Sequence, residues 1–370
     1  MLVSRPLGSR VRVVAVPVVI AITTLLAACS PAATSAPSAP SGSAAIGSAA
    51  IGSAATGSPS TASVPPTKLT VGLGYIPSVQ FAAFYRADQA GYYAAEGLQV
   101  TFQNEIDANL VPKVGAGTVD LGLSDGTSVI PAVSQGIPIK YLATVYGRFP
   151  SIVFAKASSG ITDASGLVGK KLGIPGKYGS SWIMLQALMA SKQHTVADLT
   201  VVEYPDYGQG AALAQGAVDA ATGFVNNEPV QLALTGTKVN ILAIDDVTPL
   251  PGPGIIAATA TIAAKHDAVG GFIRATFKAM NEIAADPTIG LDAATKAVPE
   301  LGKDRATQQA ILAATIAAWR PSGAATGSTI SGAVHPAAWD RTVAFMTSLG
   351  LVAKPVLAAD LVDTTFAAGP

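Results

Sequence analysis

The stretch "AGTVDLGLSD" at 116–125 returns in a second form, "QGAVDAATGF" at 215–224. Each copy reads as the end of a helix, a glycine, one residue, Val-Asp and an apolar strand. Gly117 and Gly216 suit the left-handed backbone that ends a helix. Because the same helix-to-strand unit occurs in two otherwise parallel series, the sequence predicts a duplicated α/β lobe.

Around each copy, short apolar runs alternate with helical patterns, which is typical of an α/β fold with largely parallel sheets. In the first series we expect strands near 69–74, 98–103, 119–123 and 139–145, and helices near 79–95, 108–116 and 126–135. In the second we expect strands near 171–174, 199–204, 218–224 and 239–244, and helices near 180–192, 208–215 and 228–235. From about 262 onward, apolar residues at helical spacing predict mostly helix.

The N-terminal residues predict export and anchoring. Arg5, Arg10 and Arg12 precede an apolar run that ends at Cys29, as in a signal peptide over 1–28. The segment "LLAAC" resembles the lipobox of bacterial lipoproteins, which implies that Cys29 is lipid-modified. Residues 29–67 are mostly Ala, Ser, Gly, Pro and Thr, so we expect a flexible, disordered linker.

Composition excludes several classes of protein. Charged residues make up 12% of the 370-residue chain and the formal net charge is 0, with no basic run, so no nucleic-acid partner is expected. Cys29 is the only cysteine, which rules out an intramolecular disulfide and a cysteine-cluster metal site. No two histidines lie at ligand spacing, so neither a metal nor a cofactor is expected.

Polar residues follow the repeated strand in both series. Ser124 and Asp125 follow the predicted strand of the first copy, and Asn226, Asn227 and Glu228 follow that of the second. In open α/β sheets, ligands bind outside the carboxyl ends of the strands. Glu228 also suits the first turn of a helix, but a cap needs only one Asn, and two amides beside an acid fit the edge of a heterocycle. Helix capping alone is the alternative.

Three further stretches bring aromatic and polar groups to predicted strand ends or helix starts: "GYIPSVQFAAFY" (74–85), "VYGRFPS" (145–151) and "GIPGKYGSSW" (173–182). Their rings suit a planar ligand, and exposed N–H groups at a helix start suit its polar atoms. Core packing and plain caps are the alternatives. The expected ligand-binding residues are Tyr75, Gln80, Phe81, Ser124, Asp125, Tyr146, Arg148, Phe149, Tyr178, Gly179, Ser180, Ser181, Trp182, Tyr207, Asn226, Asn227 and Glu228.

An enzymatic alternative rests on "GLSDG" (122–126), which matches the G-x-S-x-G nucleophile turn at Ser124. A hydrolase also needs a histidine and an acid beside the serine. His194, His266 and His335 fall in predicted surface turns or helix ends. The corresponding turn of the second series, "ATGFVN", has no nucleophile, so we interpret the turn as architectural and expect no catalysis.

From about Leu69 to Leu301 the chain resembles the solute-binding proteins of bacterial ABC importers in the nitrate/sulfonate/thiamine-precursor superfamily. The strongest similarity lies in "GYIPSVQFAAFYRADQAGYYAAEGLQV", "VDLGLSDG", "KKLGIPGKYGSSW" and "GAVDAATGFVNNEPVQL". The segments "NNEPVQ" and "YGRFPSIV" look closest to the riboflavin-binding branch, with hydroxymethylpyrimidine-type binders as neighbours. Tyr75 stands where the pyrimidine-binding relatives place a stacking tryptophan. The cysteine-rich motif of related fungal enzymes is not present.

The resemblance implies a type II periplasmic-binding-protein fold whose two α/β lobes are joined by a two-segment hinge. We expect lobe 1 to span 68–148 plus 253–370, and lobe 2 to span 149–252. The implied protein is a monomeric, lipid-anchored, extracytoplasmic receptor that delivers a heteroaromatic vitamin or precursor to an ABC permease. Riboflavin-like ligands rank first and thiamine pyrimidine precursors second; sulfonates and other organic anions are the alternative among binders.

Overall fold

The computed structural model describes residues 65–104, 109–248 and 250–366. The predicted signal peptide and the lipidation site Cys29 lie outside these residues, as does nearly all of the linker. The described residues belong to one compact unit. Within the described ranges, none of the helices combines the length and the apolar character that crossing a bilayer requires.

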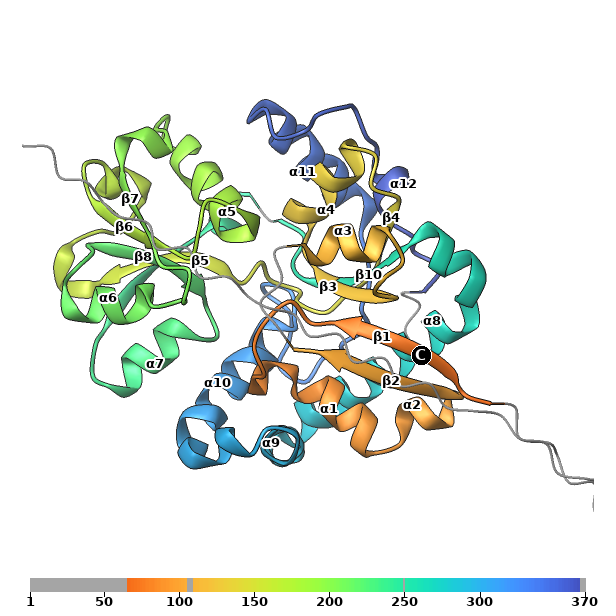
Figure 1. Ribbon diagram of the computed structural model, residues 1–370. Helices are drawn as coiled ribbons and strands as arrows, with labels where there is room; N and C mark the ends of the chain where they lie inside the picture. The colour runs from red at the N-terminus through yellow and green to blue at the C-terminus, as the bar shows by residue number, and fades with distance from the viewer. Residues whose placement is uncertain (1–64, 105–108, 249, 367–370) are drawn as a thin grey trace, which may run out of the picture. The chain divides into compact units, whose positions relative to one another are not determined.

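The first sheet has the strand order β2-β1-β3-β10-β4. Its strands are β1 (Thr67–Gly72), β2 (Leu98–Gln103), β3 (Leu121–Ser124), β4 (Ile139–Thr144) and β10 (Gly254–Ala258). The pairs β1–β2 and β1–β3 are parallel, whereas β10 runs antiparallel to both of its neighbours. The predicted strands of the first series are therefore confirmed (Figure 1).

The second sheet has the strand order β7-β6-β8-β5-β9. Its strands are β5 (Ser151–Lys156), β6 (Lys171–Ile174), β7 (Thr200–Glu203), β8 (Ala220–Phe224) and β9 (Val239–Ala243). Strand β6 pairs in parallel with β7 and β8, and β5 runs antiparallel to β8 and β9. The second sheet thus repeats the arrangement of the first.

The prediction missed β5 and β10, the two antiparallel strands. β10 is fully apolar and β5 carries four apolar residues between Ser151 and Lys156, and both follow directly on segments that join one sheet to the other. Each lies between two other strands of its sheet, so both sheets are mixed rather than largely parallel. The chain passes between the sheets twice, after β4 and after β9; the expected lobe boundaries remain a prediction.

Helices flank both sheets. Near the first sheet lie η1 (Val79–Phe81), α1 (Ala82–Gln89), α2 (Tyr92–Ala95), α3 (Leu110–Gly115) and α4 (Gly126–Ser134). The second sheet carries η2 (Ala157–Ser159), η3 (Ala164–Leu167), α5 (Gly179–Ala190), η4 (Val196–Asp198), α6 (Gln209–Gln215), α7 (Glu228–Leu234) and η5 (Ile244–Asp246). The predicted helical C-terminal part forms α8 (Thr259–Ala285), α9 (Pro287–Ala297), η6 (Pro299–Asp304), α10 (Arg305–Ala318), α11 (Pro336–Ser348) and α12 (Ala358–Leu361).

The repeated Val-Asp unit joins neighbouring strands in both sheets. Gly117 and Gly216 have φ angles of 72° and 77°, which confirms the predicted left-handed helix ends. The Asp120 carboxylate accepts a hydrogen bond of 2.8 Å from the backbone N–H of Thr70 in β1. The Asp219 carboxylate accepts one of 2.9 Å from the N–H of Lys171 in β6. The sequence repeat therefore corresponds to a repeated interaction.

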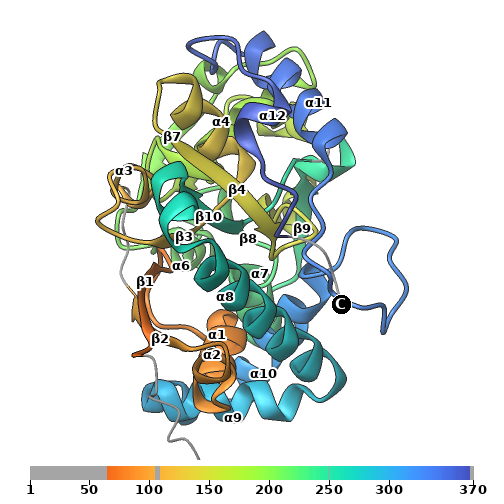
Figure 2. The ribbon, with the colours of Figure 1, turned by 90° about the vertical axis from the view of Figure 1, so that its right-hand side faces the viewer.

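Packing in the core of the first sheet fixes the position of β1. Leu69 and Val71 of β1 are buried against α1 and α8, and the rings of Tyr93 and Phe272 stack with centroids 5.0 Å apart. Figure 2 shows α8 running beside β10 and past α1 and α2 toward α9. Because this packing is dense, the end of β1 has a defined position.

Candidate ligand-binding site

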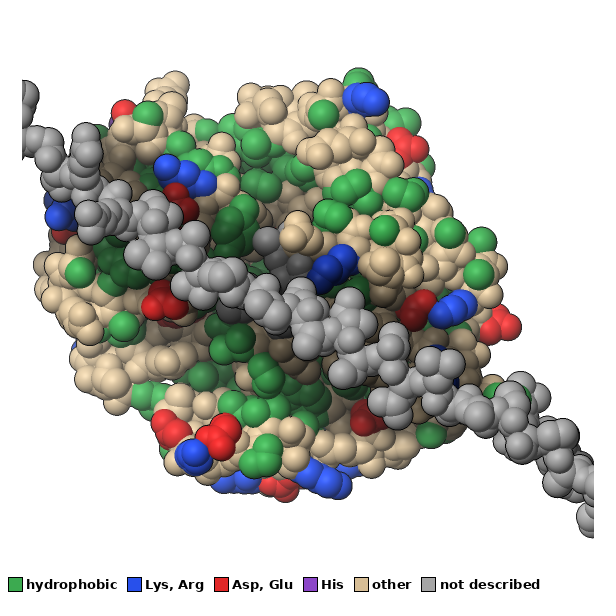
Figure 3. All heavy atoms as spheres, viewed as in Figure 1, with side chains coloured by type: hydrophobic (Ala, Val, Ile, Leu, Met, Phe, Trp, Pro, Cys, Tyr) green, Lys and Arg blue, Asp and Glu red, His purple; other side chains and the backbone are tan. Residues whose placement is uncertain are grey.

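A cavity of about 490 Å³ lies among the loops at the strand ends of both sheets. The first sheet contributes residues after β1, around α3 and at the start of α4. The second contributes the starts of α5, α6 and α7. Figure 3 shows many hydrophobic side chains around the hollow in the middle of this face. The volume and the mixed lining are those of a small-molecule site.

Aromatic side chains form much of the lining. Tyr75 follows β1 and Tyr207 precedes α6, and their rings meet edge to face with centroids 5.3 Å apart. Tyr207 has a φ of 61°, although it is not a glycine. Such a backbone costs about 1 kcal/mol and occurs mostly where the surroundings require it. Tyr146, Tyr178 and Phe224 add further ring faces to the cavity.

The hydroxyl groups of Tyr75 and Tyr207 stay neutral at ordinary pH. Burial, together with the nearby Glu228 carboxylate, raises the pKa of Tyr75 to about 12, against a hydrogen bond with Asn227. Burial likewise raises the pKa of Tyr207, with a contribution from Tyr178. Each hydroxyl can therefore both donate and accept a hydrogen bond in the cavity.

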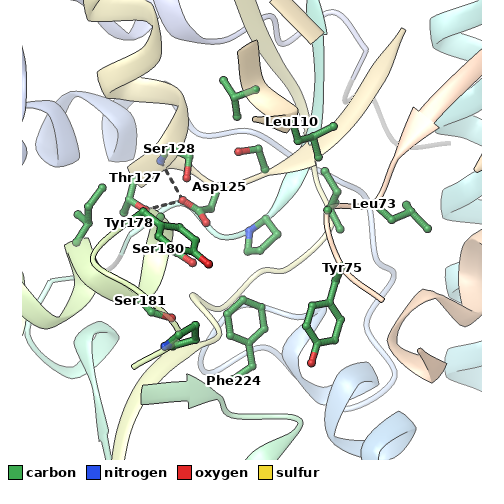
Figure 4. Close-up of a pocket in the computed structure, with 18 of the residues that line it drawn as sticks. Leu73, Tyr75, Leu110, Asp125, Thr127, Ser128, Tyr178, Ser180, Ser181 and Phe224 are labelled. Carbon is green, nitrogen blue, oxygen red and sulfur yellow. Dashed lines mark hydrogen bonds between the residues drawn. The ribbon is translucent and has the colours of Figure 1, made fainter. Parts of the chain in front are cut away.

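Asp125 places a buried carboxylate in the lining. It is the N-cap of α4, and its Oδ1 accepts hydrogen bonds from the Thr127 hydroxyl at 2.6 Å and the Ser128 N–H at 3.1 Å. The residue is 7% exposed, and burial raises the pKa of its carboxyl group in spite of these bonds. Figure 4 shows both bonds, with Tyr178 and Ser180 near Asp125 in this view and Tyr75 and Phe224 farther away.

Glu228 lines the cavity from the start of α7. Its Oε2 accepts a hydrogen bond of 2.9 Å from the Phe224 N–H, and its Oε1 accepts one of 3.4 Å from Gln209 Nε2. Burial raises the pKa of this carboxyl group. A Cβ atom at Gly223 would lie 2.6 Å from Oε2. The glycine thus leaves room for the carboxylate.

Asn226 and Asn227, which directly precede α7, have different surroundings. Asn227 lines the cavity and occupies the N-cap position, but its side chain makes no capping bond; its Oδ1 accepts from Gln231 Nε2 at 2.7 Å. Asn226 is fully buried behind the cavity, and its Nδ2 lies within hydrogen-bond distance of Thr315 Oγ1 (2.8 Å), Gln80 Oε1 (3.2 Å) and the Tyr146 hydroxyl (3.5 Å). Asn226 therefore connects three segments.

Most of the residues that the sequence singled out come together in the cavity lining. They are Tyr75, Gln80, Phe81, Ser124, Asp125, Tyr146, Tyr178, Gly179, Ser180, Ser181, Tyr207, Asn227 and Glu228.

Four of the expected residues lie outside the lining. Arg148 is exposed, Phe149 is buried in the core of the second sheet, and Trp182 packs against that core. Asn226 is buried behind the cavity, as described above.

Sequence reasoning missed part of the lining. Thr127 and Ser128 follow Asp125 directly in "SDGTS", so their position at a helix start was a usable signal. Leu110 at the start of α3 and the loop residues Ile137 and Pro253 lie far apart in the chain and carry no comparable sequence signal. Their contribution depends on how the sheets and helices pack.

The hydrolase alternative finds no support in this geometry. Ser124 lines the cavity, but none of the three histidines hydrogen-bonds to it. His194 lies 4.0 Å from Asp198 and His266 lies 3.4 Å from Asp267, both in local contacts. Among the described residues, no group of three or more metal-ligating side chains occurs.

The fold is that of the periplasmic binding proteins. The structure matches the alkanesulfonate-binding protein SsuA of Xanthomonas axonopodis pv. citri, bound to MOPS, with a TM-score of 0.62, at 18% identity over 82% of this chain and 100% of that one. It matches the periplasmic aliphatic sulphonate binding protein SsuA of Escherichia coli with a TM-score of 0.61, at 16% identity over 80% and 97% of the chains. The expected fold is confirmed.

Within this fold the chain belongs to the NMT1/THI5-like family, which it matches over residues 78–289. It is 34% identical to the riboflavin-binding protein RibY of Chloroflexus aurantiacus over 78% of this chain and 83% of that one. It is 26% identical to 4-amino-5-hydroxymethyl-2-methylpyrimidine phosphate synthase of Legionella pneumophila, over 64% and 75% of the two chains. The family resemblance stated from the sequence is confirmed.

Proposed function

We propose that this protein is the solute-binding protein of an ABC importer and captures a small heteroaromatic vitamin or vitamin precursor. The observation that carries the proposal is the ring-lined cavity between the strand ends of both sheets. The 34% identity to a riboflavin-binding protein over most of both chains supports riboflavin-like ligands as the first candidates. Thiamine pyrimidine precursors rank second.

In the proposed complex, a planar ring packs against the aromatic lining around Tyr75, Tyr207 and Phe224. Asn227 and Gln80 supply amide groups for the ring edge, and Glu228 supplies an acceptor. Closure of the two lobes would remove these groups from water, which strengthens their hydrogen bonds. The closed form would be the state that a permease recognises.

The proposal also includes the location of the protein in the cell and its partner. A signal peptide over 1–28 and a lipid on Cys29 would hold the protein at the extracytoplasmic face of the membrane, with 29–67 as the tether. The partner would be the transmembrane subunit of the importer. A monomer suffices for this role, because the cavity is complete within one chain.

An anion-binding function is the rival within the same fold. The described residues that line the cavity include Asp125 and Glu228 but no lysine, arginine or histidine. A sulfonate would therefore meet two acids without a counter-charge, which disfavours its binding. An enzymatic function is the rival from another class, since relatives are named as synthases.

The test is to purify the body from about residue 64 and record its absorption spectrum, followed by calorimetric titration with riboflavin, hydroxymethylpyrimidine and an alkanesulfonate. We expect flavin bands or tight riboflavin binding, together with a higher melting temperature. Binding of the sulfonate alone would support the rival binder. Turnover of a bound compound that Ser124→Ala abolishes would support an enzyme.

A further inference from the structure

One end of the cavity is rich in hydroxyl groups. Ser124, Thr127 and Ser128 come from the start of α4, and Ser180 and Ser181 from the start of α5. Helices α4 and α5 contact each other, so the two sets share one end of the cavity (Figure 4). The side chains of Thr127 and Ser128 interact with Asp125, whereas the hydroxyls of Ser124 and Ser180 make no hydrogen bond within the described part of the chain.

Asp125 is the charged group at this end. Its Oδ1 receives both of the hydrogen bonds described above, and the residue lines the cavity. The carboxylate oxygens can therefore also accept an O–H or N–H group of a bound ligand. Burial also raises the pKa of this group, in keeping with a carboxylate that lacks a cation.

None of the described residues that line this end of the cavity is a lysine, an arginine or a histidine. Lys177 precedes Tyr178 in the chain, but its ammonium group lies 3.9 Å from the Glu203 carboxylate and is half exposed. The start of α5 does offer unpaired N–H groups, which attract anions. A helix terminus amounts to about half an elementary charge, whereas an ionised Asp125 carries a full one. The net effect therefore repels anions.

Resting on the function proposed above, we propose that Asp125 and the surrounding hydroxyls bind an uncharged polyhydroxyl chain attached to the planar ring. Such a chain would donate to the Asp125 carboxylate and exchange hydrogen bonds with the serines. A phosphate ester on the same chain would bring a dianion to a carboxylate. Asp125 is thus the residue that selects the free compound over its phosphorylated form.

The experiment compares three compounds with the same ring system: riboflavin, riboflavin 5′-phosphate and lumichrome, which lacks the ribityl chain. Binding is measured by calorimetry or flavin fluorescence. We expect the phosphate ester to bind at least about 100-fold more weakly than riboflavin. Lumichrome should bind at least about 10-fold more weakly, because it lacks the chain that hydrogen-bonds with Asp125 and the serines.

Asp125→Asn is the informative variant, since asparagine caps a helix as well as aspartate does and retains the acceptor oxygen. It should lower the preference for riboflavin over its phosphate by at least about 10-fold. Asp304→Asn is the matched control: Asp304 caps α10 in the same way but is exposed and lies outside the cavity lining. It should leave the preference unchanged. Serine is also a good helix cap, so Asp125→Ser is used in place of Asp125→Asn if Asp125→Asn does not fold.

The outcomes separate this inference from the function on which it rests. If none of the three compounds binds, the flavin-binding function fails and the inference fails with it. If riboflavin binds but its phosphate binds equally well, only the inference is overturned. The same holds if Asp125→Asn leaves the ratio of the two affinities unchanged.

Discussion

At the residue scale, the site uses backbone geometry that a sequence pattern does not reveal. Tyr207 adopts a left-handed conformation, and this brings its ring against Tyr75 across the cavity. Asn227 occupies a capping position without capping, so its amide is directed to other partners. In both cases the side chain lies in the cavity lining.

Tyr207→Gly should weaken riboflavin binding by at least about 10-fold, because a ring face is lost. The free energy of unfolding should change by less than about 1 kcal/mol, since glycine relieves the backbone strain while the ring contact is lost. Titration and chemical denaturation measure the two effects. Gln193→Gly is the control, with the same φ of 61° at an exposed site; it should stabilise the protein and leave binding unchanged. A large loss of stability in Tyr207→Gly would contradict the argument.

Asn227→Ala should weaken ligand binding by about 1–3 kcal/mol, because a polar group of the ligand is left unpaired in the closed site. Calorimetry is the measurement. Gln231→Ala removes the local partner of the Asn227 side chain without touching the cavity lining, and should change the affinity much less. Equal affinity of Asn227→Ala and the wild-type protein would assign Asn227 a structural role only.

At the scale of elements, glycines set how closely loops and strands approach. Gly223 near the end of β8 has no space for a side chain, because Glu228 and Phe154 both lie within 2.8 Å of a Cβ atom there. The same loop carries the acid that lines the cavity. The β8–α7 connection is therefore built around one buried carboxylate.

Gly223→Ala should lower the free energy of unfolding by about 1–3 kcal/mol, the usual cost of overpacking, and should weaken binding through displacement of Glu228. Urea denaturation and titration report the two effects. Gly302→Ala is the matched control, since nothing lies within 4 Å of a Cβ atom there. If Gly223→Ala were as stable as Gly302→Ala, the loop would have more freedom than the structure shows.

At the scale of the whole molecule, buried acids couple ligand binding to the pH dependence of stability. Burial raises the pKa of Asp125 and of Glu228, whereas the Thr307 hydrogen bonds lower the pKa of the exposed Asp304. An acid with a raised pKa stabilises the folded state at low pH, and this contribution is lost as the pH rises through the raised value. An acid with a lowered pKa behaves in the opposite way.

The melting temperature of Asp125→Asn relative to the wild type should therefore rise as the pH increases from about 4 to about 7. The melting temperature of Asp304→Asn should instead lie below that of the wild type above about pH 4 and approach it as the pH falls further, because the ionised Asp304 contributes stability above its ordinary pKa. Thermal melts of the three unliganded proteins at matched salt provide the measurement. Parallel curves for the wild type and Asp125→Asn would show that the Asp125 carboxyl group is not perturbed.

The amino-acid sequence by itself determined the α/β class, the strands that carry the repeated Val-Asp unit and most of the polar and aromatic residues named above as cavity lining. These follow from local rules: apolar periodicity, glycine at helix ends, and polar residues after parallel strands. Only the tertiary structure decided that β5 and β10 lie between other strands, that Asn226 is buried while Asn227 lines the cavity, and that Leu110 and Pro253 reach it. Those outcomes depend on contacts between segments far apart in the chain, which no local pattern encodes.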